Sequence, residues 1–105
     1  MSDLLSEKKA RIVVKKLMPF LPWQSSDVKD EYDAGEYVAA ADGAIHDLGA
    51  LRTDLADALL TDIEDLIDTI REENDAYAIR FLDRMETGLY QLKTRRELAQ
   101  SGRTA

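Results

Sequence analysis

The sequence has no cysteine, only two prolines and a single histidine. The absence of cysteine excludes disulfides and thiolate zinc sites, and it fits a reducing compartment. No apolar run approaches the roughly 18 residues that would suggest a membrane helix. The first residues also lack the basic and apolar segments of a signal peptide. We therefore expect a soluble, cytoplasmic chain that does not bind membranes.

Alternation of apolar and polar residues, the pattern of a half-buried strand, is also missing over any useful length. Ala, Leu, Glu, Asp and Arg dominate, and most of these residues favour helix. With 105 residues the chain has room for one modest core. We predict one all-α domain over residues 1–99, an antiparallel bundle of four to five helices, followed by a flexible polar tail over 100–105.

Apolar periodicity and helix-terminating residues give the expected bounds. The predicted helices cover about residues 3–18, 26–34, 36–50, 54–72 and 75–98. Pro19 would end the first helix, and Gly35 would end the second in a left-handed conformation. A turn near Asn74, with Asp75 as the next N-cap, would separate the last two helices. A single long helix over 54–98 is the alternative that the sequence leaves open.

Two apolar features have predicted roles in packing. The connector containing Phe20, Leu21 and Trp23 is expected to fold onto the bundle. The helix over 36–50 would bury one side that ends with Leu51. Its other side, which contains Gly43, has small side chains that would let another backbone approach closely.

Charge is unevenly distributed along the chain, whose net charge is −7. Residues 27–75 contain 16 carboxylates and three basic side chains, whereas the segments 1–26 and 76–105 are both net basic. An acidic field repels nucleic acid and attracts basic partners. The alternative is that the basic ends and the acidic middle neutralise each other within one fold.

The sequence offers little for catalysis or metal binding. Its one histidine, His46, has Asp42 four residues earlier, but no serine or cysteine nucleophile lies in a recognisable motif. A row of outward carboxylates on one helix cannot surround a metal ion. We therefore predict no enzymatic activity, no cofactor, no metal site and no binding of nucleic acid.

The helix over 54–72 combines an apolar stripe with an acidic row on the opposite arc. The row consists of Asp54, Asp57, Glu64, Asp65, Asp68 and Glu72. We interpret these carboxylates as a candidate surface for a basic partner.

The segment Asp33-Ala34-Gly35-Glu36-Tyr37, followed by an Asp-rich helix with an apolar stripe, resembles the small helical immunity proteins of bacterial toxin systems. These include colicin D-type immunity proteins and those of contact-dependent inhibition and related polymorphic toxins. The resemblance covers about residues 27–70. It implies binding to a cognate toxin domain, often a nuclease, whose basic active-site cleft the acidic helices would cover. The expected contacts then also include Tyr32, Asp33, Glu36 and Trp23, since aromatic side chains are enriched at the centres of interfaces.

A second function stays open, namely a structural or adaptor bundle that acts by homo-oligomerisation. Ile79 and Tyr90 favour it, because both lie off the main apolar stripe of the last predicted helix. The sequence does not define the oligomeric state.

Overall fold

The computed structural model describes residues 4–104, with side chains as far as Ser101, and all regular elements in this part of the chain are helices. In chain order they are α1 (Leu5–Leu17), the short 3-10 helix η1 (Met18–Phe20), α2 (Ser26–Asp33), α3 (Tyr37–Ala50), α4 (Asp57–Glu73), α5 (Ala76–Ile79) and α6 (Leu82–Thr104). The all-α prediction is confirmed.

The predicted turn between the last two long helices is present. Asn74 adopts a left-handed conformation with φ 53°, and the carboxylate of Asp75 accepts a hydrogen bond from the backbone N–H of Ala78 at 3.1 Å. A second helix break, which the sequence analysis did not predict, follows Ile79. The sequence has neither Gly nor Pro at this point. The final helix then continues to Thr104, beyond the predicted end at residue 98 and through most of the predicted tail. The flexibility of that tail stays a prediction.

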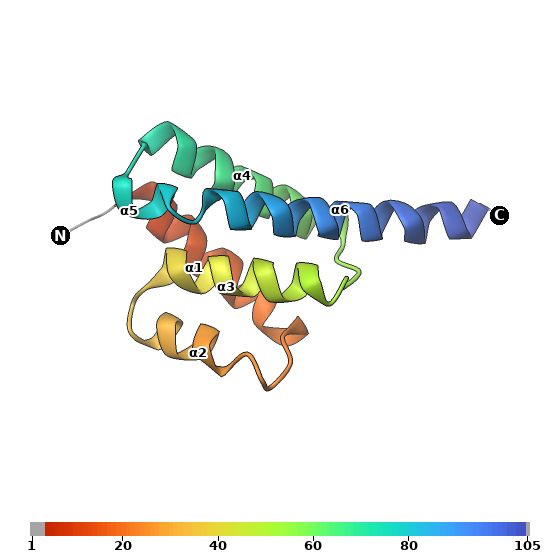
Figure 1. Cartoon of the computed structure of the whole chain (residues 1–105), viewed down its shortest axis with the longest axis horizontal. Coiled ribbons are helices and arrows are strands. Elements are labelled where there is room, and N and C mark those ends of the chain that lie inside the picture. Colours follow the sequence, from red (N-terminus) through yellow and green to blue (C-terminus); the bar gives the residue numbers. More distant parts are fainter. Residues whose placement is uncertain (1–3, 105) are drawn as a thin grey trace.

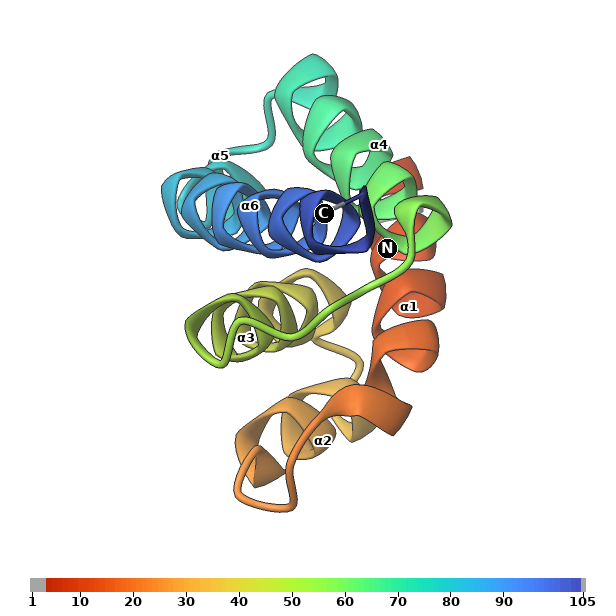
Figure 2. The ribbon, with the colours of Figure 1, turned by 90° about the vertical axis from the view of Figure 1, so that its right-hand side faces the viewer.

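The helices are arranged around α3, which packs against α1, α2 and α6. α4 packs against α1 and α6, so it lies on the other side of α6 from α3 (Figure 2). α2 runs opposite to α3, α4 runs opposite to α6, and the neighbours α3 and α6 run in the same direction (Figure 1). The C-terminal end of α6 projects beyond the other helices along the long axis (Figure 1).

Two glycines let α3 and α6 approach each other closely. A Cβ added to Gly49 would lie 2.9 Å from the backbone of Gly88, and one added to Gly88 would lie 2.8 Å from the carbonyl oxygen of Ile45. Gly43, on the side predicted to be thin, instead faces the side chain of Val28 on α2, at 3.1 Å from its hypothetical Cβ. The close backbone contact therefore lies further along α3 than the predicted one.

Burial differs sharply between α4 and α2. α4 buries six residues, namely Leu60, Ile63, Leu66, Ile67, Thr69 and Ile70; all but Thr69 belong to the predicted apolar stripe, of which Leu59 is only partly buried. α2 buries only Val28. The core therefore holds α4 firmly, whereas most of the surface of α2 faces solvent.

The ends of α2 and α3 use the same hydrogen-bonding pattern. After α2, Gly35 has φ 81°, and the N–H of Glu36 donates to the carbonyl of Glu31 at 2.9 Å. After α3, Arg52 has φ 53°, and the N–H of Thr53 donates to the carbonyl of Leu48 at 3.1 Å. Both are Schellman-type ends. The second turn leaves Leu51 60 % exposed, so its predicted place in the core is wrong.

Candidate functional site

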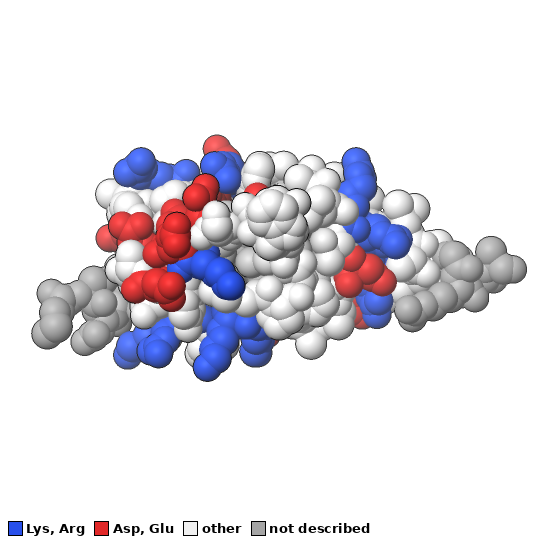
Figure 3. All heavy atoms as spheres, turned by 90° about the horizontal axis from the view of Figure 1, so that it is seen from below, with Lys and Arg blue, Asp and Glu red and all other residues white. Residues whose placement is uncertain are grey.

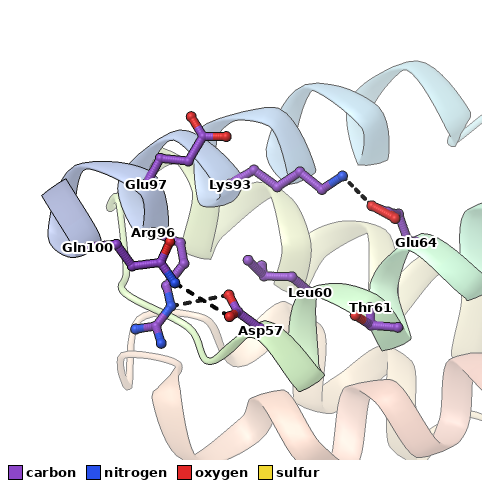
Figure 4. Close-up of a pocket in the computed structure, with 8 residues that line it drawn as sticks. All are labelled: Asp57, Leu60, Thr61, Glu64, Lys93, Arg96, Glu97 and Gln100. Atoms are coloured by element: carbon purple, nitrogen blue, oxygen red, sulfur yellow. Dashed lines mark hydrogen bonds and ion pairs between the residues drawn. The ribbon is translucent and has the colours of Figure 1, made fainter.

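The acidic row lies along α4 except for Asp54, which precedes the helix because α4 begins at Asp57 and not at the predicted residue 54. On one side the row faces basic side chains of α6. Arg96 contacts Asp57 at 3.2 Å and Asp54 at 3.4 Å, and Lys93 forms an ion pair with Glu64. Except for Asp54, these residues line a hollow of about 300 Å³ between the two helices, in which Gln100 also reaches Asp57 (Figure 4). Most of the charge in this hollow is balanced within the chain.

On its other side α4 meets the lysines of α1. The ammonium of Lys9 lies 2.8 Å from Asp65, and Lys16 lies 2.9 Å from Asp62. Lys9 also donates to the hydroxyl of Thr69 at 2.8 Å. The basic first helix is therefore placed where it neutralises carboxylates of α4.

The remaining carboxylates of the row have different surroundings. Arg71 bridges Asp68 on its own helix, at 3.1 Å, and Glu86 on α6, at 2.6 Å. Glu72 is exposed, and it forms no ion pair with any residue that the structure describes. Five of the six carboxylates of the row are thus paired within the fold. On α4, the alternative of internal neutralisation describes the structure better than a free acidic face.

The acidic residues of α2 are in a different situation. Asp27, Asp30 and Asp33 are exposed and form no ion pair within the described part of the chain. Glu31 and Glu36 extend this acidic group, and Lys29 is the one basic residue between positions 26 and 36. Acidic atoms gather over α2 on this side of the molecule, beside a broad area without charge (Figure 3). We call Asp27, Asp30, Glu31, Asp33 and Glu36 the α2 acidic surface.

The negative charge of this surface affects the pKa of Glu31. It is raised, first because burial disfavours the charged carboxylate and then because Glu36, Asp27 and Asp42 repel it. Arg84 acts in the opposite direction, but its effect is the smallest of these. The repulsion shows that carboxylates outnumber bases around this residue.

Tyr32 is half-buried and packs within the fold. Its ring makes an edge-to-face contact with Tyr37 at 5.4 Å between centroids, and the guanidinium of Arg11 lies 5.7 Å from the centroid of Tyr37. A hydrogen bond with Tyr32 is the main cause of the raised pKa of Arg11. Tyr37 is half-buried as predicted. Both rings therefore help to join α1, α2 and α3, whereas a role of Tyr32 in partner contact stays a prediction.

The connector after η1 exposes large apolar side chains. Trp23 is 86 % exposed and Phe20 is 44 % exposed, although Leu21 packs against the core. The prediction that this connector folds onto the bundle is therefore right for Leu21 and wrong for Trp23. Exposed Leu51 lies near the same region, because it lines a hollow of about 590 Å³ together with Pro22, Gln24, Ser25, Asp47 and Ala50.

One carboxylate is buried where the sequence gave no signal for it. The side chain of Asp42 on α3 is 6 % exposed and lies 3.5 Å from Nε of Arg84, and its Oδ1 has no hydrogen-bond partner. Burial raises the pKa of Asp42, while Arg84 and His46 partly oppose this shift. His46 itself is half-exposed, and its Nδ1 lies 3.5 Å from Asp47. His46 thus has Asp47 within ion-pair distance, whereas Asp42 lies beside Arg84.

Among the residues that the structure describes, no three His, Cys, Asp or Glu side chains are grouped so that they would hold a metal ion. No helix in this part of the chain has both the length and the apolar character needed to cross a bilayer. Comparisons of the sequence with family models and curated proteins, and of the structure with solved structures, give no match. Functional inference therefore rests on the surfaces of the chain itself.

Proposed function

We propose that this protein is a non-catalytic binding protein whose α2 acidic surface docks on a basic protein domain. The observation that carries the proposal is the set of exposed, unpaired carboxylates Asp27, Asp30 and Asp33. A concentrated negative field of this kind accelerates the encounter with a basic partner and fixes its orientation. The exposed ring of Trp23 lies close in sequence and supplies the apolar contact that interface centres require.

We further propose that the binding is inhibitory, as in bacterial immunity proteins, and that the partner is a toxin domain such as a nuclease. Support comes from the resemblance of residues 33–37 and from the position of these residues in the turn between α2 and α3. Carboxylates placed across a nuclease cleft would occupy positions that the phosphates of the substrate need. In this proposal the paired row on α4 contributes to folding rather than to the primary contact.

The experiment is a capture of partners from a lysate of the native source, followed by identification of the retained protein. Two charge-reversed variants are compared with the wild type. The α2 variant carries Asp27→Lys, Asp30→Lys and Asp33→Lys. The α4 variant carries Glu64→Lys, Asp65→Lys and Asp68→Lys. We expect a basic toxin domain to be retained by the wild type and the α4 variant, and to be lost by the α2 variant.

Inhibition has its own readout. Co-expression of the chain with the captured domain should protect cells from that domain, and the α2 variant should protect them poorly. A captured partner without toxic activity would contradict the immunity proposal while leaving docking on α2 intact. Retention by the α2 variant at wild-type strength would contradict the proposed surface itself.

A second function is favoured by a different observation. Tyr90 on α6 is 72 % exposed and lines a hollow of about 250 Å³ between α4 and α6, with Ile67 and Leu89 at its apolar part and the charged side chains of Glu64, Asp68, Arg71, Glu86 and Lys93 around it. Such a groove suits self-association in an adaptor bundle. Light scattering over a range of protein concentrations, with Tyr90→Ser as the variant, tests it. A concentration-dependent mass that Tyr90→Ser abolishes would favour the adaptor function.

A further inference from the structure

We propose that the hollow between Pro22 and the C-terminal end of α3 is an anchor pocket for one arginine side chain of the basic partner. This inference rests on the proposed function, and it names the group that the partner inserts. The pocket is the hollow of about 590 Å³ lined by Pro22, Gln24, Ser25, Asp47, Ala50 and Leu51. We refer to it below as the Asp47 pocket.

The walls of the Asp47 pocket are mainly apolar. Pro22 comes from the connector, and Ala50 and Leu51 come from the end of α3. Leu51 is available because the left-handed Arg52 ends the helix and leaves the leucine 60 % exposed. The methylene stem of an arginine fits against such walls while its charged end reaches a polar group.

The charged group that lines the pocket is the carboxylate of Asp47. Its Oδ2 accepts a hydrogen bond from the hydroxyl of Ser25 at 2.7 Å, and its Oδ1 faces Nδ1 of His46 at 3.5 Å. No lysine or arginine within the described residues pairs with it. Because a carboxylate accepts up to about four hydrogen bonds, Asp47 has capacity left for a cation. The bond from Ser25 fixes its orientation beforehand, which favours the two-pronged contact of a guanidinium.

The charge around the pocket selects the occupant. The polar lining contains one carboxylate and no basic side chain. The carboxylate of Asp47 would therefore repel an anion, and a neutral group would form no ion pair with it. A second hollow, of about 270 Å³, shares Pro22 and Ser25 and is also lined by Trp23 and Lys29. Lys29 disfavours a cation there, which leaves the Asp47 pocket as the place for the arginine and Trp23 as a neighbouring apolar contact.

The probe is N-acetyl-arginine N-methylamide, titrated into the 15N-labelled full chain while backbone amide and Trp23 indole signals are followed by NMR. The matched control is the citrulline compound, which has nearly the same shape and no charge. We expect saturable shifts for Gln24, Ser25, Ala50 and Leu51 with the arginine probe, at dissociation constants of about millimolar or weaker because one side chain supplies little binding energy. The citrulline compound should bind at least about fivefold more weakly, since it lacks the charge-assisted hydrogen bonds.

Two variants locate the effect at the pocket, and a third variant is the control. Asp47→Asn keeps an acceptor for Ser25 but removes the charge, and it should weaken the arginine probe about fivefold. Leu51→Lys at its exposed position places a resident cation beside Asp47 and should abolish the specific shifts. Asp83→Asn removes an exposed charge at the start of α6 and should leave probe binding unchanged within about twofold, since exposed charges are screened at a distance.

The proposal is overturned if the arginine and citrulline compounds give equal shifts, or if Asp47→Asn binds the arginine probe as the wild type does. These outcomes concern the pocket alone, because the probe needs no native partner. Failure to capture any basic domain would instead contradict the proposed function. A captured partner whose binding is insensitive to both Asp47→Asn and Leu51→Lys would retain the proposed function and reject the pocket.

Discussion

The helices α4 and α2 are both acidic in sequence, but their carboxylates meet different neighbours. α4 lies between α1 and α6, which present Lys9, Lys16, Lys93 and Arg96 to it. α2 packs against α3, whose residues 37–50 include no lysine or arginine. The carboxylates of α4 are therefore neutralised, whereas those of α2 stay unpaired and produce a negative potential.

This difference shows what a count of charges along the chain leaves out. The strongest acidic pattern in the sequence lies on α4, because its row repeats over a long helix. The structure surrounds that row with bases, while the shorter α2 keeps its carboxylates unpaired. A carboxylate stays unpaired where the fold brings no base to it, and this depends on which helices pack together.

The largest expected effect concerns how firmly each helix is held. Ile63→Ala removes a fully buried side chain of α4 and should lower the free energy of unfolding by about 2–5 kcal/mol. Val28→Ala, at the single buried position of α2, removes two methyl-sized groups and should cost about 1.6 kcal/mol before any cavity effect. Urea denaturation of both variants gives the comparison. Equal losses would mean that α2 is held as firmly as α4.

The next effect separates paired from unpaired carboxylates. The α4 variant with Glu64→Lys, Asp65→Lys and Asp68→Lys breaks three ion pairs and places lysines beside bases, which should cost about 1–3 kcal/mol in total. The cost should shrink at high salt because screening weakens the repulsion.

The α2 variant described above is the matched control. It should change stability by less than about 1 kcal/mol, since its three positions are exposed and unpaired. Thermal melts at low and high salt measure both variants. A larger loss in the α2 variant than in the α4 variant would contradict the contrast between the two helices.

A smaller effect tests Arg84 of α6, whose Nε lies 3.5 Å from the buried carboxylate of Asp42 on α3. Arg84→Gln should lower stability at neutral pH by about 1 kcal/mol, because the contact with Asp42 is long and Arg84 is half-exposed. The loss should diminish in acid, where Asp42 is protonated and no longer needs a cation.

Asp42→Asn gives the complementary pH dependence. Because the pKa of Asp42 is raised in the folded state, the folded protein binds this proton more tightly than the unfolded chain. The carboxylate therefore lowers stability at neutral pH, and that penalty disappears as the pH falls through the raised pKa towards the ordinary value of 3.8. The asparagine variant should exceed the wild type in stability at pH 7 and lose this advantage in acid. Urea midpoints across this range check the sign, and an advantage that grows in acid would refute it.

The smallest effect on stability is expected at Trp23. Trp23→Ala should change the free energy of unfolding by no more than about 0.5 kcal/mol, since the side chain is 86 % exposed. It should nevertheless increase the dissociation rate of the captured partner. Tyr32→Ala is the contrasting variant, because loss of its ring contact with Tyr37 should cost about 1 kcal/mol. Unchanged partner dissociation in Trp23→Ala would remove the tryptophan from the contact surface.

Parts of the candidate surface were predictable from sequence. Asp33, Glu36 and Trp23 belong to the predicted set, and the structure places all three on the surface. Asp47 and Leu51 were missed as surface groups. Asp47 lies outside the longer acidic row to which the charge pattern drew attention, and Leu51 was assigned to the core. The hydrogen bond between Ser25 and Asp47 joins a connector to a helix, so no local sequence pattern predicts it.

The sequence by itself determined the helical class and most of the helix ends. Gly35, Asn74 and Asp75 act through their own backbone and neighbours within a few residues, which is why their positions were readable. Tertiary structure alone decided which carboxylates are neutralised, because the pairing groups are far apart in the chain. Arg96 reaches Asp57 across 39 positions, and Lys16 reaches Asp62 across 46. Such contacts depend on how α1, α4 and α6 pack together, and α6 is itself positioned by the close approach to α3 that Gly49 and Gly88 allow.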